Sequence, residues 1–412
     1  MESNQNRANQ HSSSQHSSSQ HSYRAQRVLH GETWLDDALI TIDSDGIIAA
    51  IEKFDATQHA NFIDLGKVNL LPGMVDTHVH GAKGCDVMDA SHESLDTMSR
   101  FFASLGVTAF VPTTITAPVA KVRAALQQVG KSKQHGVEGA EILGAYLEGP
   151  YFTEKHKGAQ PTKWFRDLSV EELDDWISYC DNNLITVALA PEKAGAIDAI
   201  RHLCKQGIKV TLGHSDASYE QVKQAFDAGA SGVVHCYNGM RGLHHRDPGV
   251  VGAGLTHPNC YVEMIADGHH VHPAAIDVAH RCSGSRLTLI TDAMSATGMP
   301  DGEYTLGEYT VHMKDGVVTT DAGGLAGSTL TLLTAVKNIQ QWLNLPLEQA
   351  WLMASLAPAQ SLGLQHQIGT LEVGKRASMV AVKSDFSIEK TWVNGRLIFK
   401  AESVPSQEAL CI

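Results

Sequence analysis

The sequence predicts an α/β protein: a (β/α)8 barrel of the TIM type with a small β-sandwich domain built from both termini. Two patterns lead to this fold class. In the middle of the chain, short apolar runs alternate with helix-like stretches such as SLDTMSRFFASLG and YEQVKQAFDAGA. Near both ends, short segments of alternating polarity replace this pattern. Near-continuous apolar strands that alternate with helices are typical of a parallel sheet, because the helices cover both of its faces.

The composition is that of a compact enzyme, since 43% of the 412 residues are hydrophobic and 19% are charged. A net charge of -13 argues against a nucleic-acid partner, because a phosphate backbone needs a basic face. The 7 cysteines are odd in number and form no CxxC, which argues against a disulfide framework and a cysteine-rich zinc site. The sequence contains no long apolar run and no signal-peptide pattern, so we expect no membrane partner and a cytoplasmic protein.

The elements can be justified in chain order. Residues 1–25 include the repeat QHSSSQHSSSQHS, so we expect a disordered low-complexity tail outside the fold. Residues 26–72 contain alternating segments such as ALITIDSDGIIAAIE, with a DG turn at Asp45-Gly46. A similar pattern returns in residues 365–405, with an NG turn at Asn394-Gly395. These two segments are expected to form the β-sandwich domain together.

Residues 73–364 are expected to form the barrel. They contain the apolar runs LLPGMVDTHVH, VTAFVPTT, EILGAYLEGP, LITVALAPE, IKVTLGHSD, SGVVHCYNGM, CYVEMIADGHH and RLTLITDAM. This number of strand and helix units matches a (β/α)8 barrel, in which the chemistry takes place at the C-terminal ends of the strands.

Imidazoles and carboxylates gather at those strand ends. They are His78 and His80 in the first run, Glu148 in the third, His214 in the fifth, His235 in the sixth and Asp292 in the eighth. In the HxH pair both side chains point to one face, because strand side chains repeat every two residues. Each residue alone could be an ordinary hydrogen-bonded polar group. Together they converge on one mouth, where buried charge is costly unless it is paired or bound to a cation.

The pattern therefore predicts a divalent metal site with nitrogen and carboxylate ligands. Such ligands suit Zn²⁺ best, and also Fe²⁺, Mn²⁺ or Co²⁺. Cys236 lies next to His235, but alternation sends it toward the helices, so we interpret it as a packing residue.

Seven motifs in order resemble the N-acetylhexosamine-6-phosphate deacetylases of the amidohydrolase superfamily: PGMVDTHVHG, YLEGPYF, LGHSDA, VHCYNGM, ADGHHVH, LITDAMSATG and GGLAGSTLT. The phrases HCYNGM, GLHHR and MPDGEYTL resemble the N-acetylgalactosamine-6-phosphate branch in particular. The resemblance implies hydrolysis of N-acetyl-D-galactosamine 6-phosphate to D-galactosamine 6-phosphate and acetate, in amino-sugar catabolism. The glucosamine epimer, or both epimers, is the open alternative.

The resemblance also implies roles for the strand-end residues. Glu148, His214 and His235 would bind the principal ion. His78 and His80 match the members that hold a second ion, so one or two ions per subunit are expected. Asp292 would act first as general base and then as general acid, which fits the need of a leaving amine for a proton.

Substrate contacts are implied at further positions. Asn238, the Gly239 N–H and Arg246 would bind the phosphate, with Arg246 reaching the neighbouring site in a homodimer. The remaining implied contacts are Asp267, His269 and His270 around the sugar, and Leu325, Ala326 and Gly327 closing over it. Where the family commonly has KGxH, this chain has Lys157-Gly158-Ala159-Gln160. We therefore expect Ala159 and Gln160 at the substrate, with Gln160 giving weaker electrophilic help and an altered sugar preference.

Two more distant functions remain open. A cyclic amidohydrolase such as a dihydroorotase often uses a carboxylated Lys, whereas Glu148 occupies the comparable strand end here. A non-catalytic relative would be a binding or scaffold protein. The presence of Asp292 and of all the proposed ligands argues against it.

Overall fold

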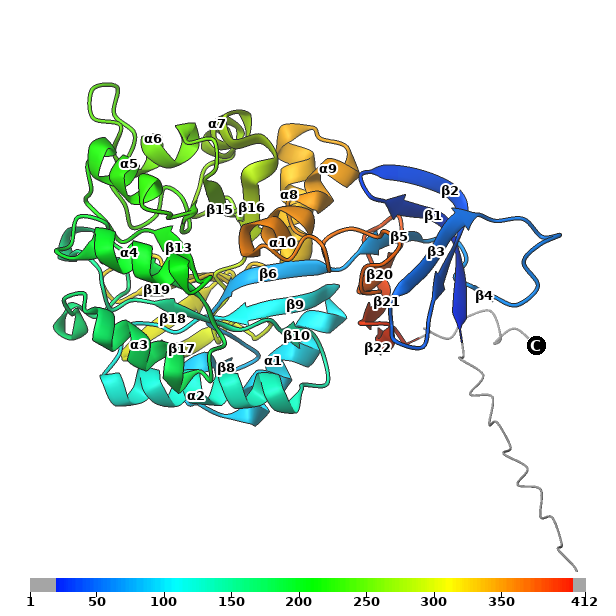
Figure 1. Cartoon of the computed structure of the whole chain (residues 1–412), viewed down its shortest axis with the longest axis horizontal. Helices are drawn as coiled ribbons and strands as arrows, with labels where there is room; N and C mark the ends of the chain where they lie inside the picture. The colour runs from blue at the N-terminus through cyan, green and yellow to red at the C-terminus, as the bar shows by residue number, and fades with distance from the viewer. Residues whose placement is uncertain (1–19, 403–412) are drawn as a thin grey trace, which may run out of the picture.

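The computed structural model describes residues 20–402. Two regions are evident in Figure 1: a large one in which helices surround a central sheet, and a smaller sheet that combines the beginning and the end of the described chain. Residues 1–19 of the predicted tail lie outside the described residues. The last three residues of the predicted C-terminal segment, 403–405, lie outside them as well.

The smaller region is one sheet with the strand order β22-β21-β20-β5-β1-β2-β3, and β4 pairs with β1. Its strands are β1 (His21–His30), β2 (Thr33–Ile42), β3 (Ile48–Lys53), β4 (Ile63–Asp64), β5 (Asn69–Pro72), β20 (Met379–Val382), β21 (Ile388–Val393) and β22 (Arg396–Lys400). The two termini do combine, as expected. However, hydrogen bonds join their strands into a single sheet instead of the two sheets of a sandwich. The sheet encloses its own core, in which Tyr23 of β1 meets Trp392 of β21 edge to face at 5.2 Å.

Strand β1 begins at His21, inside the segment that the composition assigns to the disordered tail, so that boundary is wrong for residues 21–25. Tyr23 and Ala25 are buried on one face of the strand. Arg24 points to the other face and pairs with Asp37, with 2.7 Å between Nε and Oδ1. This alternation is the ordinary strand pattern, and the neighbouring Ser/Gln repeat concealed it.

The large region contains two groups of parallel strands. One group has the order β11-β12-β13-β14-β15-β16 and the other β10-β9-β6. Single bridges, from Thr113 to Tyr146 and from Val79 to Ala293, join the two groups at both edges. The strands are β6 (Met74–Val79), β9 (Val107–Pro112), β10 (Glu141–Ile142), β11 (Ala145–Glu148), β12 (Leu184–Leu189), β13 (Lys209–Leu212), β14 (Gly232–Val233), β15 (Tyr261–Ile265) and β16 (Leu287–Ile290). The ring closes as in a TIM-type barrel, so the polar strand ends meet at one mouth.

Helices alternate with these strands and cover the barrel (Figure 1). They are α1 (His92–Ser104), α2 (Val119–His135), α3 (Val170–Tyr179), α4 (Ala196–Lys205), α5 (Tyr219–Asp227), α6 (Gly249–Thr256), α7 (Pro273–Ser283) and α8 (Leu332–Leu343), followed by α9 (Leu347–Leu352) and α10 (Leu356–Leu362). The local sequence determines where several of these helices begin. For example, Ser218 caps α5 by accepting a hydrogen bond from the Gln221 N–H, and the Gln221 side chain bonds back to Ser218.

A three-stranded antiparallel sheet follows the last barrel strand and was not expected from the sequence. It consists of β17 (Gly302–Leu306), β18 (Tyr309–Lys314) and β19 (Val317–Thr320). Two shorter strands, β7 (Gly81–Ala82) and β8 (Cys85–Asp86), pair after β6. The β17–β19 sheet packs on Ile115 and Met294 near the barrel mouth, so it adds a wall to the site.

Two expectations from composition can be compared with these residues. No helix between residues 20 and 402 is long and apolar enough to span a bilayer. Within the same range every cysteine is a free thiol, and Cys236 is fully buried in the hydrophobic core, as expected of a packing residue.

Candidate metal centre and active site

The strand-end residues predicted from the sequence do meet at the barrel mouth. His78 lies in β6 and His80 directly after it, and Glu148 ends β11. The other three residues follow β13, β14 and β16, and all have positive φ: His214 at 46°, His235 at 27° and Asp292 at 52°. This conformation is uncommon for residues other than glycine, and it is held in proteins mostly where function requires a particular side-chain direction.

The first group of close ligand atoms is formed by Glu148, His214 and His235. Glu148 Oε1 lies 3.3 Å from His214 Nε2 and 3.2 Å from His235 Nε2, and the two nitrogens are 3.2 Å apart. All three side chains are at least nine-tenths buried. This is the trio that the family resemblance assigns to the principal ion.

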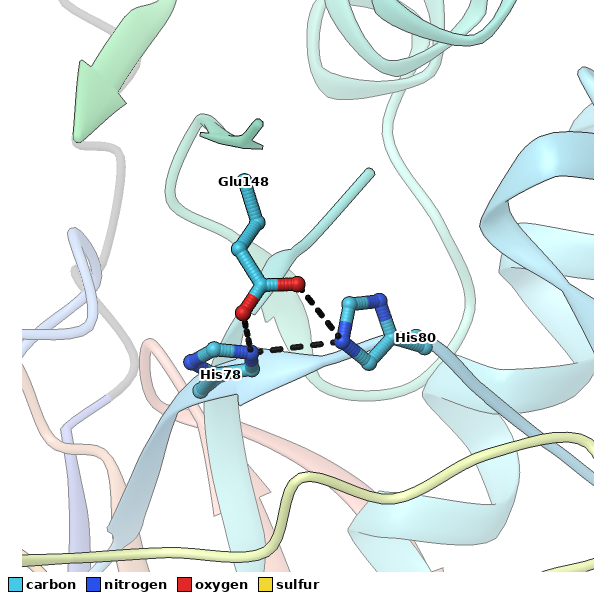
Figure 2. Close-up of side chains that lie close together, drawn as sticks. All are labelled: His78, His80 and Glu148. Carbon is cyan, nitrogen blue, oxygen red and sulfur yellow. Dashed lines mark hydrogen bonds and ion pairs between the residues drawn. The ribbon is translucent and has the colours of Figure 1, made fainter. Parts of the chain in front are cut away.

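The second group consists of His78, His80 and the same Glu148, as Figure 2 shows. The two Nε2 atoms are 3.3 Å apart. His80 Nε2 is 3.5 Å from Glu148 Oε2, whereas His78 Nε2 is 3.7 Å from Oε1. Glu148 therefore offers its carboxylate to both groups, and the arrangement can hold two neighbouring ions.

Hydrogen bonds on the far side of the rings fix which nitrogen can bind an ion. Nδ1 of His80, His214 and His235 lies 3.0–3.1 Å from a backbone carbonyl, namely that of Thr113, His156 and Asn238 respectively. A carbonyl only accepts, so each Nδ1 must carry the proton. In the neutral rings the Nε2 lone pairs then point to the centre of the site, where they can bind a metal ion in place of a proton.

Electrostatics at the centre also favour a cation. Burial lowers the pKa of His235, but the hydrogen bond and charge of Glu148 outweigh burial and raise the pKa to about 9. Burial likewise opposes the charged form of His80, yet Asp292 and Glu148 raise its pKa to about 9. A field that holds protons this strongly also attracts a divalent ion. The nitrogen and carboxylate donors fit Zn²⁺ and related metals.

Asp292 is placed for proton transfer. Its Oδ1 lies 3.2 Å from His80 Nε2 and 3.7 Å from His78 Nε2. Burial alone would raise the pKa of Asp292, but the hydrogen bond with His80 and the surrounding imidazoles lower it. The side chain is therefore a carboxylate at neutral pH and can accept a proton.

A cavity of about 370 Å³ opens over these residues, a size suited to a small ligand. Its lining includes twelve predicted site residues: His80, Glu148, Ala159, Gln160, His214, His235, Asn238, Gly239, His270, Asp292, Leu325 and Gly327. Gly239 has φ +60°, and a Cβ there would lie 2.9 Å from His214 Nδ1, so any other residue would be strained and would crowd the imidazole. Its backbone can therefore approach both the imidazole and a ligand.

Gln160 has both ends of its amide committed. Nε2 donates to Glu148 Oε2 at 2.6 Å, and Oε1 accepts from the Thr116 N–H at 2.9 Å. The sequence-based expectation gave Gln160 a direct role at the substrate. The geometry makes it a support of Glu148 that also lines the cavity.

The other predicted residues lie outside the cavity lining. His78 is fully buried beneath the cavity, and Ala326 is buried in the apolar cluster behind it. Asp267 accepts from His270 Nδ1 at 2.6 Å, so it orients a residue that does line the cavity. His269 is exposed. Arg246 is exposed as well and contacts His245.

Several lining residues were not predicted. Ile115 and Leu306 are apolar, and Thr320 and Gly324 belong to the β17–β19 region. No periodic or chemical signal distinguishes them in the sequence. The sequence analysis also missed Glu263, a buried carboxylate that contacts His78. A charged residue inside the apolar run CYVEMIA could have indicated it.

Comparison with known proteins agrees with this geometry. Residues 69–398 match the model of the amidohydrolase family. The chain is 75% identical over 390 residues to an N-acetylglucosamine-6-phosphate deacetylase of Vibrio furnissii, covering 95% of this chain and 98% of that protein. It is 50% identical over 374 residues to an N-acetylgalactosamine-6-phosphate deacetylase of Escherichia coli O157:H7, covering 91% and 98%.

A solved structure shows the same likeness in three dimensions. It is a mutant N-acetyl-D-glucosamine-6-phosphate deacetylase of Mycobacterium smegmatis in complex with N-acetyl-D-glucosamine-6-phosphate. Its TM-score is 0.88 at 30% identity, over 93% of this chain and 100% of that one. With the buried carboxylate and imidazole cluster at a barrel mouth, these matches show that the chain belongs to the amidohydrolase family and is a hydrolase of that family.

Proposed function

We propose that this amidohydrolase removes the acetyl group from an N-acetylhexosamine 6-phosphate, releasing acetate and the free amine. The observation that carries the proposal is the position of Asp292 at the floor of one cavity, 3.2 Å from His80. There it lies beside two candidate metal groups, His78 with His80 and His214 with His235, which share Glu148. The names of the relatives supply the substrate class, since the 75% and 50% identical proteins are both deacetylases of such sugars.

The proposed principal ligands are Glu148, His214 and His235, and the proposed second site is His78 and His80 with Glu148. Zn²⁺ is the preferred ion for these donors, with Fe²⁺, Mn²⁺ and Co²⁺ as alternatives. When bound, such an ion polarises the amide carbonyl and lowers the pKa of water.

Asp292 carries the proton through the reaction. As a carboxylate it takes a proton from the attacking water, and it later gives that proton to the amine nitrogen. Expulsion of an amine without this proton would be slow, because the unprotonated amide anion is a poor leaving group. The imidazoles of His78 and His80 near Oδ1 keep Asp292 ionised before each turnover.

The substrate would lie across the rest of the cavity. Asn238 and the Gly239 N–H are proposed to bind the phosphate, as charge-assisted donors do. His270, oriented by Asp267, would contact a ring hydroxyl. Arg246 is exposed on its own chain, so its proposed phosphate contact requires the partner subunit of a homodimer.

The epimer is the finer part of the proposal. The 75% identical relative is named for glucosamine, and this favours N-acetyl-D-glucosamine 6-phosphate. The motifs GLHHR and MPDGEYTL, and the 50% identical relative, favour the galactosamine epimer that the sequence alone predicts. Both candidates share the acetamido and phosphate groups.

A kinetic comparison tests the proposal. Acetate release is measured from both N-acetylhexosamine 6-phosphates with the Zn²⁺-reconstituted protein, and the unphosphorylated sugars serve as controls. We expect release from at least one phosphorylated epimer, with a far higher kcat/KM than for its unphosphorylated form. Absence of release from both would contradict the proposed function.

A further inference from the structure

Glu263 is a buried carboxylate that the proposed reaction does not use. It lies in β15, and its side chain is 8% exposed. A carboxylate in the interior of a barrel costs free energy unless it has a partner. The identity of that partner therefore indicates what Glu263 does.

The partner is His78 of β6, which lies 185 positions earlier in the chain and is separated from β15 in the ring only by β16. Glu263 Oε2 is 3.2 Å from His78 Nδ1. The opposite ring nitrogen, Nε2, faces the metal-ligating atoms: it lies 3.3 Å from His80 Nε2 and 3.7 Å from Asp292 Oδ1. His78 thus differs from His80, His214 and His235, whose Nδ1 atoms are paired with neutral backbone carbonyls.

We propose that Glu263 is a positioning residue for the inner ion site of His78, His80 and Glu148. As an acceptor it places the proton of His78 on Nδ1 and leaves the Nε2 lone pair for the ion. Its charge also makes that nitrogen a stronger donor than a carbonyl partner would. The inference rests on the two-ion arrangement proposed above, but not on the identity of the sugar.

A small polar cavity explains how the charge on Glu263 is tolerated. Besides Glu263, the residues that line it include Thr77, Thr211, Thr288 and Lys209. The buried Thr77 and Thr288 hydroxyls have no hydrogen-bond partner among the described residues. The cavity has room for about one water molecule. Such a water would satisfy a threonine hydroxyl and solvate the carboxylate.

Metal titration of the full chain tests the inference. The protein is stripped with a chelator and titrated with Zn²⁺ by calorimetry, with folding checked by circular dichroism. We expect two binding events for the wild type and loss of one of them, the inner ion, in Glu263→Ala, as in His78→Ala. Glu263→Gln keeps the shape and removes the charge, so the inner ion should bind about 10- to 100-fold more weakly while the outer ion is unaffected.

Thr288→Val is the matched control, because Thr288 lines the same cavity but its hydroxyl makes no hydrogen bond to Glu263 or His78. It should bind both ions like the wild type. Two equivalents bound with wild-type affinities by Glu263→Gln would overturn the inference, as would equal weakening of both ions, which indicates a general structural role. A wild type that binds one equivalent also overturns it. Acetate release is measured separately, so the deacetylase proposal stands or falls independently, and Glu263→Gln decides the matter if Glu263→Ala does not fold.

Discussion

The outer histidines, His214 and His235, and the inner pair, His78 and His80, share one carboxylate but differ in position. The outer pair follows short strands in strained backbone and lines the substrate cavity. His78 lies within β6, is fully buried and contacts no part of the cavity. We propose a division of labour on this basis: the outer histidines would face the reacting amide, whereas His78 would support the floor beneath it, and His80 lines the cavity beside Asp292.

The largest effect is expected at the outer group. His235→Ala should remove the principal ion and lower kcat/KM by roughly 10³-fold or more, because metal polarisation of a carbonyl contributes several kcal/mol. Metal analysis measures the bound ion, and the rate of acetate release gives kcat/KM. His257→Ala is the control, since that imidazole stacks on Phe226 away from the site. Equal activity of His235→Ala and wild type would remove His235 from the site.

The inner group should give a smaller effect. His78→Ala is expected to lose one equivalent of metal and to retain more activity than His235→Ala, because the outer trio remains intact. Metal stoichiometry and kcat, measured side by side for the two variants, test the ranking. A loss at His78 that equals or exceeds the loss at His235 would break the proposed division of labour.

Gln160 supports the carboxylate that both groups share. Gln160→Leu removes the donor to Glu148 Oε2, and we expect metal affinity to fall by about 10-fold. Gln160→His introduces the residue common in the resembling family, so the ratio of kcat/KM for the two epimers is measured as well. Unchanged affinity and an unchanged ratio in both variants would leave Gln160 without a role.

The smallest effect is expected at Gly239. An alanine there must adopt a left-handed conformation, at a cost of about 1–2 kcal/mol, and its Cβ presses on His214. Relief of this crowding would shift the Gly239 N–H from the proposed phosphate position, and loss of a hydrogen bond worth about 1.5 kcal/mol there corresponds to about a 10-fold rise in KM. Gly242→Ala is the matched control, since a Cβ at that position meets nothing within 4 Å. Wild-type KM in Gly239→Ala would show that the close approach is unimportant.

The same comparison shows what a sequence can predict. The convergence of the outer and inner residues was predictable, because they stand at the ends of apolar runs and a barrel brings strand ends together. The hydrogen-bond partners of these residues were not predictable. Three of the imidazoles are held by backbone carbonyls, which every residue possesses, and Gln160 turns toward Glu148 because of a contact with Thr116 that only the folded loop creates. Glu263 carried a signal, but its partner lies 185 positions earlier in the chain and comes near it only when the ring of strands closes.

In the terminal regions, too, the local pattern predicted the strands but not their long-range partners. Alternating polarity predicted strands at both ends, and they do combine. Their joining into one sheet depends on β5 pairing with β1 on one side and β20 on the other, and no local pattern encodes this. The β17–β19 strands alternate too, yet their place beside the cavity depends on packing against Ile115.

Asp292→Asn provides the most direct test of metal-dependent amide hydrolysis at this site. The substitution keeps the size of the side chain but removes its ability to take and return a proton. We expect metal content to stay at the wild-type level while kcat for acetate release falls by about 10²- to 10⁴-fold. Wild-type kcat in Asp292→Asn, with the metal still bound, would contradict the account.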